Sequence, residues 1–121
     1  MFSSSNLAEL TDKGRQTTLD LGYRLRHLYV DQLRFLPATI SDWTMIYLRA
    51  SPFPRTLESV QQTFSGLYPS QMRAAALPRP TIVTRTLGDE TLLPNDDHCQ
   101  RLMQLSKAFA QRTADRCEYT V

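Results

Sequence analysis

The chain has 121 residues, of which 41% are hydrophobic and 21% are charged. This length and composition fit one ordinary domain or a part of a larger one, and they exclude wholesale disorder. No stretch approaches the ~20 consecutive apolar residues of a membrane-spanning helix, and residues 1–6 lack the features of a secretory signal. The balance of 14 basic and 12 acidic residues argues against a dedicated nucleic-acid-binding protein.

The first predicted element is a helix over residues 11–35, in which Thr11 is the N-cap and Pro37 stops the helix. Its apolar stripe recurs at helical spacing and consists of Leu21, Leu25 and Leu28. Gly14 and Gly22 each cost up to ~1 kcal/mol relative to alanine inside a helix. Such glycines often mark a close approach of another backbone.

The middle of the chain predicts a strand, a helix and a second strand. Residues 44–49 are rich in β-forming residues, and Pro54 fits the first turn of the helix that follows. Gly66 is typical of a helix C-cap, and residues 81–86 form a weaker strand candidate. The apolar face of this second helix carries Leu57, Val60, Phe64 and Leu67.

A last helix is predicted after Pro94, capped by Asn95 or Asp96. The order helix, strand, helix, strand, helix favours an α/β architecture with helices packed on a sheet. Two strands make a poor sheet, because such a layer usually has about four or more. The small number of predicted strands therefore indicates an incomplete layer. We expect residues 1–121 to form a single incomplete segment, with a flexible start (1–9) and a flexible tail (117–121).

Cysteine and histidine usage gives no sign of a metal or a disulfide scaffold. Cys99 and Cys117 could form one bridge or be two buried thiols. His27 and His98 show no metal-ligand spacing with them. We expect no metal and no organic cofactor.

Two arginines stand where the first predicted strand gives way to a helix. Arg49 lies at the carboxyl end of the strand, and Arg55 lies in the first turn of the helix. Ligands of open α/β sheets bind beyond the carboxyl ends of the strands, and a helix N-terminus favours anions. This spacing predicts an oxyanion site, most plausibly for phosphate. The alternative is that both arginines pair with carboxylates such as those of Glu58 or Asp42.

Five short motifs in order resemble the histidine acid phosphatases, which form the second branch of the histidine phosphatase superfamily. The later Leu92-Leu93-Pro94-Asn95 with Cys99 is most similar to the lysophosphatidic acid phosphatase subgroup. The resemblance covers about Leu10 to Arg116. The five motifs are Leu10-Thr11-x-x-Gly14, Leu21-Gly22-x-x-Leu25-Arg26-x-x-Tyr29, Tyr47-x-Arg49-Ala50-Ser51, Arg55-Thr56-Leu57-Glu58-Ser59 and Gly66-Leu67-Tyr68-Pro69.

The resemblance implies part of a phosphoglycerate-mutase-like α/β layer and a phosphomonoester substrate. In such enzymes a histidine of an Arg-His-Gly motif attacks phosphorus, and a later His-Asp pair protonates the leaving oxygen. By the same resemblance Arg55 is a phosphate ligand. Arg49, Ser51 and Thr56 are supporting residues, and no catalytic residue and no metal ligand is assigned to this chain.

The chain departs from that family where the chemistry would occur. It contains no Arg-His-Gly, and the Arg26-His27 pair lies in the middle of a predicted helix, so His27 is expected to be a helix-surface residue. Asp97-His98 reverses the order of the family's acid pair. The strands that carry the nucleophile and the catalytic acid are therefore missing from this layer, and we expect these 121 residues alone to be inactive or nearly so.

Two other classes of function compete with a phosphatase segment. One is a non-catalytic α/β module that binds phosphate esters or a protein, with possible self-association through an exposed sheet edge. The other is a small helical interaction domain, favoured only by the 17 leucines.

Overall fold

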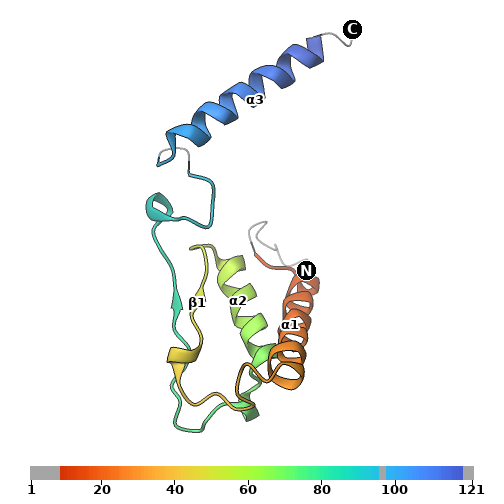
Figure 1. Ribbon diagram of the computed structural model, residues 1–121, viewed down its shortest axis with the longest axis vertical. Coiled ribbons are helices and arrows are strands. Elements are labelled where there is room, and N and C mark those ends of the chain that lie inside the picture. Colours follow the sequence, from red (N-terminus) through yellow and green to blue (C-terminus); the bar gives the residue numbers. More distant parts are fainter. Residues whose placement is uncertain (1–8, 96–97, 119–121) are drawn as a thin grey trace, which may run out of the picture. The chain divides into compact units, whose positions relative to one another are not determined.

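The computed structural model describes residues 9–95 and 98–118, which divide into two units, one ending at Arg85 and the other beginning at Thr86. The predicted flexible start and tail fall largely outside these residues, and the single-segment organisation stays a prediction. The helices and strands (Figure 1) are α1 (Asp12–Arg26), β1 (Leu48–Arg49), α2 (Pro54–Leu67), β2 (Ile82–Val83) and α3 (Gln100–Glu118). Their order is the predicted one, and they form a partial α/β fold.

The first helix begins as predicted and ends differently. The Thr11 hydroxyl accepts a hydrogen bond from the Gly14 N–H at 3.1 Å, which caps α1. After Arg26 the helix widens into a π-helical stretch over His27–Gln32. Arg34 then takes a left-handed conformation with a φ of 50°, so the helix ends before Phe35. The predicted stop at Pro37 was wrong, because a left-handed residue ends a helix without any proline.

The first predicted strand is shorter than residues 44–49. The Asp42 carboxylate accepts a hydrogen bond from the Thr44 N–H at 2.9 Å and turns Trp43–Met45 into a short 3-10 helix. Such a local side-chain bond competes with strand formation. The same bond holds the pKa of Asp42 below its usual value. Of the predicted strand, Leu48 and Arg49 form β1.

The two strands form a parallel ladder of two residue pairs. Leu48 faces Ile82, and Arg49 faces Val83. One more bond continues the ladder, because the Ala50 N–H donates to the Val83 carbonyl at 3.1 Å. The predicted second strand over residues 81–86 is thus present but reduced to its centre. The parallel arrangement brings both carboxyl ends to the same edge of the sheet.

The helices α1 and α2 lie side by side (Figure 1) and touch through two glycines. A Cβ atom on Gly22 would lie 2.1 Å from the Thr63 carbonyl oxygen, and one on Gly66 would lie 2.3 Å from the Leu19 carbonyl oxygen. The close approach expected at Gly22 is therefore confirmed. The prediction of Gly66 as a C-cap was wrong, because this residue lies inside α2, which is capped at Tyr68.

The core is small and lies beneath α2. Its buried members are Ile40, Phe64 and Tyr68. The Tyr68 hydroxyl donates to the Pro37 carbonyl at 2.8 Å, and burial raises the pKa of this phenol. The partly buried side chains packed against these three are Trp43, Ile46, Leu48, Leu67 and Leu77. The three buried members are at most 3% exposed, whereas Leu21 of the predicted α1 stripe is 41% exposed.

The second unit contains α3, which begins at Gln100 rather than directly after its predicted cap. The Asn95 amide donates to the Gly88 carbonyl at 2.9 Å, and Asp96, the other predicted cap, lies outside the described residues. Cys99 precedes the helix and is exposed, so the alternative of two buried thiols was wrong at this residue, while Cys117 lies near the end of the helix. At 1.5 Å per residue these positions are roughly 27 Å apart. One bridge between them is excluded, because a disulfide needs Cα atoms within about 7 Å.

Within the described part of the chain, none of the helices combines the length and the apolar character needed to cross a bilayer.

Candidate functional site

The predicted oxyanion site lies in the connection between β1 and α2. Arg49 ends β1, and the next two residues, Ala50 and Ser51, are buried. The chain then crosses Pro52 and enters α2 at Pro54, whose fixed φ suits the first helical position. A buried strand end and a proline-started helix together fix where the first turn of α2 begins.

Ser51 and Thr56 brace this connection. The Ser51 hydroxyl donates to the Thr56 hydroxyl oxygen at 2.9 Å. The Thr56 hydroxyl in turn lies 2.7 Å from the Ser51 carbonyl and 2.8 Å from the Phe53 carbonyl. Both side chains are therefore engaged with the loop backbone and with each other. This arrangement suits the supporting role predicted for them, because it holds the loop rather than a ligand.

Arg55 is the second residue of α2 and is exposed. Its guanidinium carbon lies 4.7 Å from the centre of the Phe53 ring, a cation–π contact that restrains the side chain. Phe53 is the N-cap and offers no side-chain acceptor to the first-turn N–H groups. Among the described residues, Arg55 forms no ion pair. The Thr56 and Leu57 N–H groups bond to the Phe53 carbonyl instead, each at 3.1 Å. The charged Arg55 side chain thus lies at the end of the helix that carries its positive partial charge.

The carboxylates proposed as competing partners have other partners of their own. Glu58 binds Arg15, with 2.5 Å between the Arg15 Nε and the Glu58 Oε1. Asp42 accepts from the Thr44 backbone. The pairing of Arg55 with Glu58 or Asp42 is therefore absent from the described contacts. Sequence reasoning missed the Arg15–Glu58 pair, because its members are 43 residues apart and no local pattern joins them.

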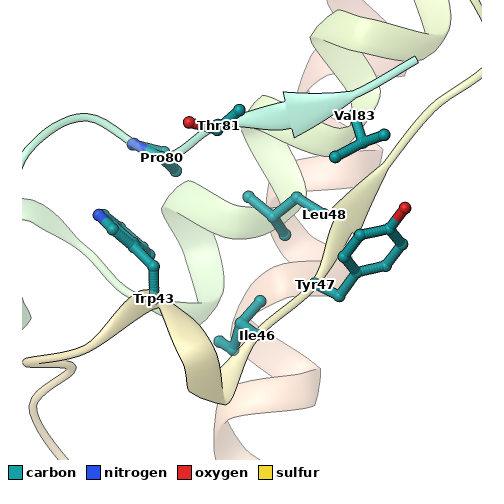
Figure 2. A pocket seen from close by; sticks show the side chains of 7 residues that line it. All are labelled: Trp43, Ile46, Tyr47, Leu48, Pro80, Thr81 and Val83. Atoms are coloured by element: carbon teal, nitrogen blue, oxygen red, sulfur yellow. The ribbon is translucent and has the colours of Figure 1, made fainter.

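Other hollows of the first unit have a different character. Figure 2 shows one of about 210 Å³, in which Trp43 and Pro80 lie on one side of Leu48, and Tyr47 and Val83 on the other. No charged side chain lines it, so it does not suit phosphate. A groove of about 330 Å³ along α1 and α2 is almost entirely apolar and is lined by Thr18, Leu21, Leu25, Leu48, Ser59, Val60, Thr63, Phe64 and Leu67.

A further hollow of about 280 Å³ has Arg73 and Arg79 in its lining. Arg73 is occupied by the core: its Nε donates to the Tyr68 carbonyl at 2.7 Å, and its guanidinium carbon lies 4.8 Å from the Phe64 ring centre. This guanidinium stabilises the end of α2, whereas that of Arg55 faces solvent. Arg55 is accordingly a better candidate than Arg73 for binding an anion.

The histidines occupy surface positions. The His27 side chain is 68% exposed, 3.6 Å from the Asp31 carboxylate and 3.1 Å from the Gln32 amide. His98 lies 3.0 Å from the Asn95 amide, and its neighbour Asp97 is outside the described residues. The described residues hold no cluster of three or more His, Cys, Asp or Glu side chains that could bind a metal ion.

Several known proteins that are similar to this chain are named as phosphatases. Residues 1–119 match the family described as histidine phosphatase superfamily (branch 2). A "Probable acid phosphatase" of Schizosaccharomyces pombe is 51% identical over 88% of the chain and 22% of its own length. "Counting factor 60" of Dictyostelium discoideum is 35% identical over 80% of the chain and 24% of its length. Human "Lysophosphatidic acid phosphatase type 6" is 31% identical over 85% of the chain and 23% of its own length. The chain thus spans less than a quarter of these relatives.

Proposed function

Because the chain belongs to branch 2 of the histidine phosphatase superfamily, we propose that it is a segment of an acid-phosphatase-type phosphomonoesterase and supplies an arginine that holds the phosphate. The observation that carries the proposal is the exposed Arg55 guanidinium, which forms no described ion pair and stands at the start of α2, directly after the carboxyl end of β1. Ser51 and Thr56 fix that start. Arg49 is proposed as a second supporting residue, since it ends the strand that leads into the loop.

In this role Arg55 binds and orients the substrate. Its planar guanidinium can donate two parallel hydrogen bonds to phosphate oxygens, and the α2 N-terminus adds a positive partial charge. Such groups stabilise the negative charge of the transferring phosphoryl group. They do not replace the histidine that would form the phosphohistidine intermediate, and the 121 residues contain no Arg-His-Gly to supply it.

Arg55→Ala is expected to weaken the binding of inorganic phosphate about tenfold or more, the effect of losing one charge-assisted hydrogen bond and a nearby charge. The measurement is a phosphate titration of the chain at pH 7, followed by backbone amide shifts of residues 55–57 in nuclear magnetic resonance spectra. Arg101→Ala is the matched control, because Arg101 is likewise exposed and second in its helix, α3. An equal loss in both variants, or a loss in neither, would refute a phosphate site at Arg55.

The chain alone is expected to show no turnover of p-nitrophenyl phosphate at acid pH. The reason is chemical: positioning phosphate accelerates its transfer only when a nucleophile is present. His27→Ala serves as the control, since this exposed histidine is the one that superficially resembles the missing motif. Turnover that His27→Ala abolishes, with phosphate trapped on that residue, would overturn the assignment of His27 to the helix surface.

The competing idea of self-association through the sheet edge stays a prediction. The described sheet has two strands, so each has one side without a strand partner among the described residues.

A further inference from the structure

The N-terminal parts of α1 and α2 are joined by a two-point ion pair between Arg15 and Glu58. The Arg15 Nε donates to one Glu58 carboxylate oxygen at 2.5 Å, and its Nη2 donates to the other at 3.3 Å. The remaining Nη1 donates to Asp12 at 2.7 Å. The side chains of Arg15 and Glu58 are 39% and 28% exposed. These carboxylates raise the pKa of Arg15 above its usual value, Glu58 having the larger effect.

Glu58 is also a helix neighbour of Arg55. The two residues are three positions apart in α2, a spacing at which side chains on a helix surface meet. A glutamate at this spacing would be the natural acceptor for the Arg55 guanidinium. Such a pair would occupy the guanidinium N–H groups of Arg55 that an anion needs, and it would place a negative charge beside the anion. In the structure, both Glu58 oxygens are engaged by Arg15 instead.

We propose that Arg15 is a positioning residue that holds Glu58 away from Arg55 and so keeps the Arg55 guanidinium available to an anionic ligand. The identity of that ligand as a phosphate ester rests on the proposed function above. The arrangement of the Arg15, Glu58 and Arg55 side chains does not depend on that proposed function. Asp12 contributes by occupying the Arg15 nitrogen that Glu58 does not use.

The test is a double-mutant cycle on the full chain with Arg15→Gln, Glu58→Gln and both together. The first measurement needs no ligand: the side-chain Nε–Hε signal of Arg55 in nitrogen-15 spectra. It should move in Arg15→Gln, stay in place in Glu58→Gln, and return in the double variant. Arg24→Gln is the matched control, because Arg24 is another exposed arginine of α1. A signal that moves in Glu58→Gln alone would overturn the proposal, since Glu58 would then already contact Arg55.

The second measurement is the affinity for inorganic phosphate in the same variants. Arg15→Gln should weaken binding about twofold, the scale of an exposed pair at this helix spacing. Glu58→Gln should change the phosphate affinity little when Arg15 is present. In the Arg15→Gln background it should restore the affinity. If Glu58→Gln tightened binding equally in both backgrounds, charges acting at a distance would explain the result and the proposal would fail. If the unmodified chain bound no phosphate, only the proposed function would fail, because the Arg55 signal still tests the inference.

The cycle also remains informative if Arg15→Gln does not fold. Glu58→Gln then tests the inference alone, through the position of the Arg55 signal. Fluorescence of Trp43, the single tryptophan of the chain, reports whether each variant is folded.

Discussion

Gly22→Ala is expected to destabilise the first unit by about 3 kcal/mol or more, the upper range for overpacking a tight contact. The added Cβ would lie 2.1 Å from the Thr63 carbonyl oxygen and 2.8 Å from the Gly66 Cα. Both obstacles are backbone atoms of α2, so no side-chain rotation relieves the clash and the two helices must separate. Gly66→Ala should have a similar effect, because its Cβ would meet the α1 backbone at Leu19.

Two other glycines provide controls with the opposite expectation. A Cβ on Gly14 would meet side-chain atoms alone, with Leu10 Cδ1 at 2.8 Å and the Thr11 hydroxyl oxygen at 3.4 Å, and one on Gly88 would meet nothing within 4 Å. Gly14→Ala should therefore stabilise α1 by roughly 0.5–1 kcal/mol, the gain in helix propensity. Urea unfolding followed by Trp43 fluorescence compares the variants. If Gly22→Ala raised the midpoint as Gly14→Ala should, helix propensity alone would explain both results and the close packing of α1 on α2 would be refuted.

This contrast shows what the sequence could predict about the helices. A glycine inside a helical pattern indicated a close approach, and at Gly22 that inference is confirmed. At Gly66 the nearby Pro69 favoured a C-cap, yet the residue is the other half of the same contact. Local patterns detect that a small residue is needed. They do not reveal which distant segment requires it, because that depends on tertiary packing.

The strands were predicted in the right order and at too great a length. β-forming residues indicate only a tendency to form a strand, because each ladder hydrogen bond also needs a partner residue on a neighbouring strand. Residue 44 is lost to the Asp42 turn, and the ladder itself extends over two residue pairs. The order of elements depends on turn residues such as Pro54 and is therefore visible in the sequence. The length of a strand depends on the partners that the fold provides.

The candidate site shows the same division. The placement of Arg55 at a helix start was predicted from Pro54 and is confirmed, because both depend on neighbouring residues. Its role as a phosphate ligand stays a prediction. The Arg15–Glu58 pair could not be predicted, since it requires knowing that the N-terminal parts of α1 and α2 lie together. Within α2 the sequence placed Arg55 and Glu58 as neighbours, and the tertiary fold decided which arginine Glu58 binds.

Phe64→Ala is expected to cost about 3–5 kcal/mol, the usual loss when a buried phenylalanine is truncated. Phe64 is 3% exposed and stands at the centre of the core. Its ring centre lies 5.6 Å from that of Trp43 and 6.0 Å from that of Tyr68, and the Arg73 guanidinium covers it at 4.8 Å. Truncation would remove the partner of all three at once and open a cavity beneath α2.

A loss of this size would leave the first unit largely unfolded, because a core of this extent rarely supplies more than about 3–5 kcal/mol. The expected observation is a red-shifted Trp43 emission without denaturant and no cooperative urea transition. Phe109→Ala is the matched control, since that ring is 74% exposed on α3 and should change neither quantity. A cooperative transition in Phe64→Ala with a midpoint near that of the unmodified chain would show that stability comes from elsewhere. The remaining source of stability would then be the glycine-mediated contact of α1 with α2. Gly22→Ala disrupts this contact without changing Phe64 and therefore tests it independently.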